Sequence, residues 1–111
     1  MAYPKRAVID TIRTIGFAAI GAGYIAVGAA FAAPVRIISI KNTTNENIFF
    51  SDDGVNDKFV IPAGSGSVYD LTAARTNQEN LFLAEGGFAY IRRAGGAPTS
   101  GNCYIEIVRG L

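Results

Sequence analysis

PVRIISIKNTTNENIFF, residues 34–50, is the stretch that decides the fold class of this chain. It holds two short apolar runs, 35–40 and 48–50, separated by the polar residues 42–47. Short runs rich in Val, Ile and Phe and bounded by Pro and Asn are typical of β-strands. Because side chains alternate along a strand, Ile38 and Ile40 face one side and Val35 and Ile37 the other. We therefore expect a strand over 35–41 that is largely buried on both sides.

Short apolar runs separated by turn residues continue to the end of the sequence. Asp53-Gly54 predicts a hairpin turn, because Gly accepts a positive φ. Seven strands are predicted after Pro34, over residues 35–41, 48–50, 58–61, 67–71, 81–83, 88–92 and 103–108. One more is predicted near 24–27. The pattern predicts an all-β chain that forms an antiparallel β-sandwich of jelly-roll-like form.

An apolar run, residues 15–33, precedes this region and allows three interpretations. Basic residues before it and Ala30-Phe31-Ala32 at its end fit a secretion signal, and its nineteen uncharged residues could just span a bilayer. Twelve of the nineteen are Ala or Gly, however, and these add little transfer energy. We expect the run to be retained and to form extended chain, with no membrane partner.

Residues 4–15 carry Val8, Ile9, Ile12 and Ile15 at spacings of three and four. This spacing is compatible with a short amphipathic helix, or with an extended arm that lies on another subunit. We accordingly divide the chain into an N-terminal arm, 1–23, and a β-sandwich domain, 24–111.

The composition excludes most kinds of catalytic site. The chain has no histidine and a single cysteine, Cys103, which excludes Ser-His and Cys-His nucleophile pairs, the usual zinc sites and an internal disulfide. The formal charge of +1 gives no reason to expect a nucleic-acid partner. Only 17% of the residues are charged, which suggests that a partner covers part of the surface. We expect neither an enzyme nor a cofactor, and we expect Cys103 to be buried.

Two polar clusters allow alternative interpretations. The acidic stretch 52–57 has the closely spaced oxygens of a calcium loop but lacks the downstream glutamate, so a plain turn is favoured. Arg92-Arg93 and Arg109 with Arg75 could bind phosphate, lie on a solvated strand edge, or pair with the carboxylates of a partner protein.

Four segments taken together resemble a known class of proteins. They are YIAVG (24–28), PVRIISIKNTTNENIFFSDDGVNDKFVIPAGSGSVYDL (34–71), TNQENLFLAEGGFAYIR (76–92) and SGNCYIEIV (100–108). Over residues 17–108 the chain resembles small virion proteins of short-tailed double-stranded DNA bacteriophages. It is most similar to the capsid decoration proteins, also called staple or cement proteins, of epsilon-fifteen-like phages.

This resemblance implies a jelly-roll-like protein that is made in the host cytoplasm, binds the exterior of the capsid and clamps neighbouring major capsid subunits without catalysis. It also implies contacts with other copies of the chain in a homo-oligomer. We expect the partner interface to include Val8, Ile9, Ile12, Ile15, Phe17, Phe49, Tyr69 and Tyr90. The alternatives are a head-to-tail connector or tail protein of the virion and, in a different class, a secreted or membrane-anchored β-sandwich binding module.

Overall fold

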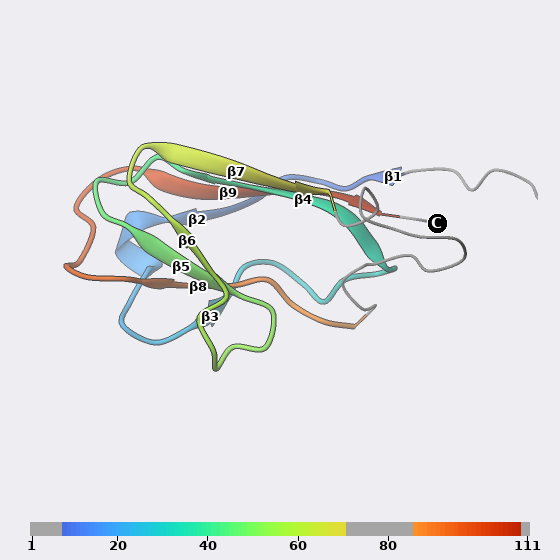
Figure 1. Ribbon diagram of the computed structural model, residues 1–111, viewed down its shortest axis with the longest axis horizontal. Coiled ribbons are helices and arrows are strands. Elements are labelled where there is room, and N and C mark those ends of the chain that lie inside the picture. The colour runs from blue at the N-terminus through green and yellow to red at the C-terminus, as the bar shows by residue number, and fades with distance from the viewer. Residues whose placement is uncertain (1–7, 71–85, 110–111) are drawn as a thin grey trace, which may run out of the picture.

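The computed structural model describes residues 8–70 and 86–109, which form two β-sheets packed face to face (Figure 1). Nine strands and one short 3-10 helix, η1, are present in these residues. In chain order they are β1 (Val8–Ile9), β2 (Arg13–Gly16), η1 (Phe17–Ala19), β3 (Ile25–Ala26), β4 (Val35–Asn42), β5 (Ile48–Ser51), β6 (Phe59–Ile61), β7 (Ser65–Asp70), β8 (Tyr90–Arg93) and β9 (Asn102–Arg109).

The strand order confirms the predicted antiparallel sandwich. Sheet A has the order β1-β9-β4-β7, and β2 also pairs with β9, while sheet B has the order β3-β8-β5-β6. Every pairing is antiparallel. Apart from β1 and β2 and the β5–β6 hairpin, successive described strands belong to different sheets. The strand predicted over 81–83 lies outside the described residues.

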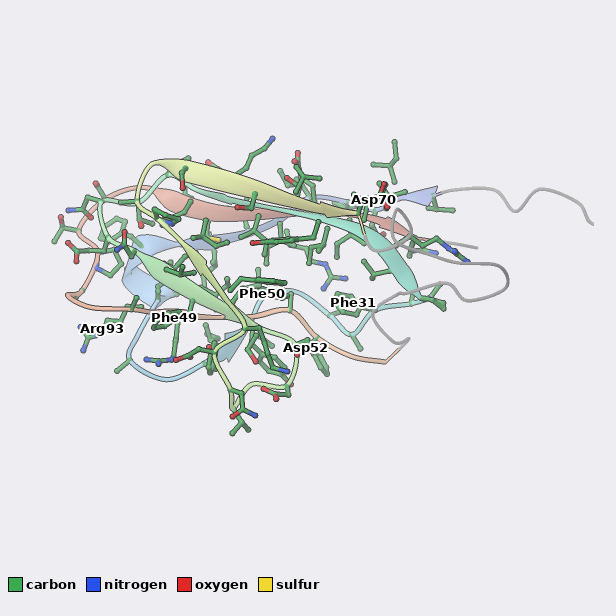
Figure 2. The ribbon with its side chains drawn as sticks, viewed as in Figure 1. Phe31, Phe49, Phe50, Asp52, Asp70 and Arg93 are labelled. Carbon is green, nitrogen blue, oxygen red and sulfur yellow. The ribbon has the colours of Figure 1, made fainter. Side chains whose placement is uncertain are left out.

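Alternation along β9 shows how the sequence builds the core. Cys103, Ile105 and Ile107 are fully buried, whereas Tyr104 and Glu106 face outward. In sheet B, Phe50 occupies the equivalent inner position on β5 and lies between the two sheets (Figure 2). Each such side chain stabilises the fold by about 1.5–3 kcal/mol through burial of apolar surface.

The prediction that β4 is buried on both sides was wrong in one respect. The pairing of β4 with β9 shifts in register between Val35 and Ile37. Beyond this irregularity Ile38 and Ile40 face the core. Ile37, Ser39 and Lys41 lie on the outer surface of sheet A. A strand of one sheet in a two-layer sandwich has only one covered face.

The residues before the sandwich are extended, so the helical alternative for 4–15 is wrong over its described part, 8–15. Asp10 donates its N–H to Ile107 O, and Arg13 lies opposite Ile105. Two residues, 11 and 12, therefore face the single residue Glu106, which is a β-bulge. The pairing places 13–16 in sheet A, and the division of the chain at residue 23 stays a prediction.

The apolar run 15–33 contains the end of β2, η1 and β3. Within the described part of the chain no helix has the length and hydropathy needed to cross a bilayer. Ile20, Val27 and Phe31 of this run belong to the core of the sandwich, as expected for extended chain that packs in the domain.

Candidate interaction surfaces

Arg13 on β2 points inward between the sheets, although it is charged. Its Nη1 donates to the carbonyl oxygen of Val27 at 3.2 Å and to that of Ala29 at 2.7 Å, and its guanidinium carbon lies 5.1 Å from the centroid of the Phe31 ring. Burial lowers the pKa of Arg13, and the Asp10 carboxylate opposes this shift. Arg13 therefore ties the β3–β4 connection to β2 and closes this end of the core.

The sequence analysis did not identify this role of Arg13. The available signal was that Arg13 is the only charged residue between Asp10 and Arg36. A single arginine in an apolar stretch that becomes buried must find acceptors for its N–H groups. Here the acceptors are carbonyl oxygens on either side of Gly28, whose φ is +83°.

The N-terminal residues predicted to contact a partner are divided between the surface and the core. Ile9 is 81% exposed and Ile12 is 50% exposed, while Val8 is half-buried. Ile15 lies in the hydrophobic core at 7% exposure, so it presents almost no surface. Phe17 begins η1 and is 38% exposed. Ile9, Ile12 and Phe17 are thus the members of this set that a partner could reach.

An apolar patch extends across the outer face of sheet A. Ile9 lies opposite Val108, and Val108 lies opposite Ile37. Strands β1, β9 and β4 therefore each contribute one residue to a row of apolar side chains across the sheet. Val68 on β7 lies opposite Ser39 and is therefore a diagonal neighbour of Ile37. We call the residues Ile9, Ile37, Val68 and Val108 the sheet A patch. Exposed apolar groups gathered on one face in this way are characteristic of protein-binding surfaces.

The outer face of sheet B carries half-buried aromatic residues that contact their own chain. The guanidinium carbon of Arg92 lies 4.8 Å from the ring centroid of Phe49 and 5.4 Å from that of Tyr24. Two nitrogens of Arg92 donate to the Asp57 carboxylate at 2.9 and 2.7 Å, and the Tyr24 hydroxyl also donates to it. These hydrogen bonds hold the pKa of Asp57 below its usual range.

The β5–β6 loop, 52–58, covers part of this aromatic face. Asp57 attaches the loop to Arg92, and Gly54 approaches the ring of Tyr90 so closely that a Cβ there would lie 3.2 Å from it. Phe49 and Tyr90, both predicted partner contacts, are consequently half-buried within the monomer. Arg92 thus pairs with a carboxylate of its own chain, and the three interpretations given for it from the sequence stay predictions.

Tyr69, another predicted partner contact, packs against the core of the sandwich. Its ring stacks on Phe59 with centroids 4.0 Å apart, and Phe59 stacks on Phe50 at 5.9 Å. Because β7 belongs to sheet A and β5 and β6 belong to sheet B, the three rings connect the two sheets. Tyr69 is therefore placed to hold the sandwich together.

The acidic stretch 52–57 forms a turn, as predicted. The Asp53 carboxylate accepts hydrogen bonds from the N–H groups of Val55 and Asn56 and from the Ser51 hydroxyl. Lys58 lies 3.4 Å from Asp52 and 3.8 Å from Asp53. Within residues 8–70 and 86–109, no three potential metal-ligating side chains come together. The Asp53 carboxylate is thus occupied by donors of the turn itself, whereas Asp57 is bound by Arg92 and Tyr24.

Comparison with known proteins gives a match in structure only. No family model matches the sequence, and a search of curated proteins finds no match. The fold is similar to that of a chain in the "acidic stable capsid structure of Helicobacter pylori bacteriophage KHP30", with a TM-score of 0.56. That likeness covers 97% of this chain and 94% of the other, at 8% sequence identity. At this identity the comparison establishes a shared fold.

Proposed function

We propose that this protein is a non-enzymatic structural protein of a phage virion that binds the outside of the capsid and connects neighbouring major capsid subunits. The observation that carries the proposal is the fold likeness to a chain of a phage capsid structure over nearly the whole of both chains. The resemblance of residues 17–108 to capsid decoration proteins supports the same role from the sequence alone.

The surface chemistry supports a binding role. A protein that binds only the assembled shell stabilises that shell by mass action and needs no reactive groups. The sheet A patch and Ile12 offer apolar area that one monomer leaves uncovered, with Ile9 at 81%, Ile12 at 50% and Val68 at 67% exposure. We propose that the arm residues Ile9, Ile12 and Phe17 contact capsid subunits.

The first test is the intact mass and copy number of the protein in purified particles from its source. Mass spectrometry and calibrated gel densitometry that find hundreds of full-length copies would support shell decoration. About a dozen copies would instead assign the protein to the neck or tail. Absence from particles, or a mature chain that starts near Ala33, would contradict a virion role.

The second test locates the contact surface. Ile9→Lys and Ile12→Lys place a charge on exposed apolar positions, so binding to particles stripped of this protein should weaken by tenfold or more in each variant. Val55→Lys is the matched control, because Val55 is 78% exposed on the β5–β6 loop. Equal binding by all three variants would show that the arm does not contact the shell.

A further inference from the structure

Among the edge strands formed by residues 8–70 and 86–109, β7 is the one whose own sequence and pairing show no feature that discourages strand pairing. In sheet B the edge strands β3 and β6 have two and three residues. At the β1/β2 edge of sheet A, the bulge at residues 11 and 12 interrupts the strand. Short edge strands and bulges both discourage pairing between molecules.

Strand β7 differs from these edges in every respect. Its six residues, SGSVYD, pair with β4 without a register shift, from Ser65 opposite Asn42 to Asp70 opposite Ile37. It contains no Pro, Lys or Arg, and its single charge lies at its last residue. Within the described residues, β7 pairs with β4 alone. A long, regular, nearly uncharged edge is a template for another extended strand.

We propose that β7 pairs with β7 of a second copy of this chain. The two strands run antiparallel about a two-fold axis perpendicular to the sheet, so that the two copies of sheet A form one continuous sheet. An isologous interface of this kind uses the same surface on both subunits and closes at two copies. The sheet A patches of the two copies then lie side by side on one face.

The outward side chains select one register. Residues directly opposite each other in an antiparallel pair share a face, so a symmetric pairing can place Val68 opposite Val68 of the second copy. Asp70 then lies opposite Gly66 of the second copy. A shift of two residues in one direction places Val68 opposite Asp70, and in the other direction opposite Gly66. The first register is favoured because it joins the two exposed valines.

Charge complementarity supports the same register and a second copy as the occupant. Gly66 pairs with Lys41 on β4, and a Cβ at Gly66 would stand 3.2 Å from Cγ of Lys41, so the Lys41 side chain leans over the glycine. In the favoured register, Asp70 of one copy lies across Gly66 from Lys41 of the other. Lys41, already 2.9 Å from Glu106, would then lie between two carboxylates. The two-fold axis repeats this arrangement on both sides of the valine pair.

The oligomeric state of the isolated full-length chain tests the proposal without any capsid, and so independently of the proposed virion role. Sedimentation velocity over a concentration series should show a monomer–dimer equilibrium. Val68→Lys places like charges opposite each other and should make the chain monomeric, whereas the control Val55→Lys should leave the dimer intact. A wild-type chain that is monomeric throughout overturns the proposal, and so does a dimer that survives Val68→Lys.

A cysteine at position 68 tests the register. Directly opposite Cα atoms lie about 4.5–5.5 Å apart, within the range that a disulfide spans. Val68→Cys should therefore form a covalent dimer on mild oxidation, and the control Val60→Cys, which is exposed on sheet B, should not. Cys103 is buried and does not compete. Absence of a covalent dimer for Val68→Cys, or equal yields for the two variants, would contradict the proposed pairing.

Discussion

The side chain of Arg13 lies directly against Gly28, so that a β-carbon at residue 28 would stand 3.0 Å from Cδ of Arg13. Gly28 also has a φ of +83°, in the left-handed region that L side chains rarely adopt. Two independent constraints, backbone conformation and space, thus require glycine where the β3–β4 connection passes β2.

Gly28→Ala should lower the free energy of unfolding by about 1–3 kcal/mol, because it strains the backbone and displaces Arg13. Urea titration measures this quantity. Gly23→Ala is the matched control, since a Cβ at Gly23 meets nothing within 4 Å, and its effect should stay within about 0.5 kcal/mol. Equal effects of the two substitutions would show that the contact with Arg13 is not constraining.

Arg13→Met should destabilise the fold by about 1–3 kcal/mol. The substitution keeps much of the apolar length of the side chain but leaves the carbonyl oxygens of Val27 and Ala29 without their donor. Arg93→Met is a suitable comparison, because Arg93 is half-buried and its side chain has no hydrogen-bonded partner among the described residues. Thermal unfolding followed by circular dichroism should separate the two variants, and a tolerated Arg13→Met would contradict the closing role of this residue.

The stability of the protein should fall as the medium becomes acidic, in part because of Asp53. Hydrogen bonds from Ser51 and from the N–H groups of Asn56 and Val55 hold the pKa of the Asp53 carboxyl well below its usual value of 3.8. The folded state therefore binds this proton less readily than the unfolded state. The resulting stabilisation is present above the unfolded pKa and is lost as the pH falls toward the folded one.

Asp53→Asn removes that contribution, so the free energy of unfolding of the variant should depend less steeply on pH than that of the wild type below about pH 4. Asp52→Asn leaves the hydrogen bonds of the turn in place and is the control for the loss of one carboxylate from this loop. Parallel urea titrations across the acid range measure the slopes. A slope for Asp53→Asn equal to that of the wild type would show that this turn does not contribute.

Cys103 should be inert while the protein is folded. Its side chain is fully buried beneath sheet A, and burial raises the pKa of the thiol to about 12. The thiolate is the reactive species, so alkylation near neutral pH should proceed only through unfolded molecules. Mass spectrometry after iodoacetamide treatment, with and without urea, tests this expectation, and rapid labelling without urea would contradict it.

The alternation of apolar and polar residues was sufficient to predict a strand where one face of that strand meets the core. The alternation over 103–108 predicted β9 and the burial of Cys103, and the turn at Asp53-Gly54 followed from residues that bond to their own backbone. The spacing of Ile9, Ile12 and Ile15 gave no correct choice between helix and strand. The bulge at residues 11 and 12 inserts one residue and imitates helical periodicity in an extended segment.

The functional surfaces depend on contacts between distant parts of the sequence. Phe49 was recognised as an aromatic residue of the second predicted strand, but its environment is set by Arg92, forty-three positions later, and by the return of Asp57 to the same face. The order of the strands decides whether an aromatic side chain on the outer face is exposed to solvent or covered by another part of the chain. Such order arises from pairings that the local pattern does not encode.

The position of β9 between β2 and β4 has a consequence for synthesis of the chain. β9 is the last of the described strands to leave the ribosome, yet sheet A cannot connect its first strands to β4 without it. Until then the nascent chain can form at most the β4–β7 pair and the four described strands of sheet B, with sheet A incomplete over the core. Completion of the sandwich therefore waits for β9, and chains truncated before it should be the form most prone to aggregate.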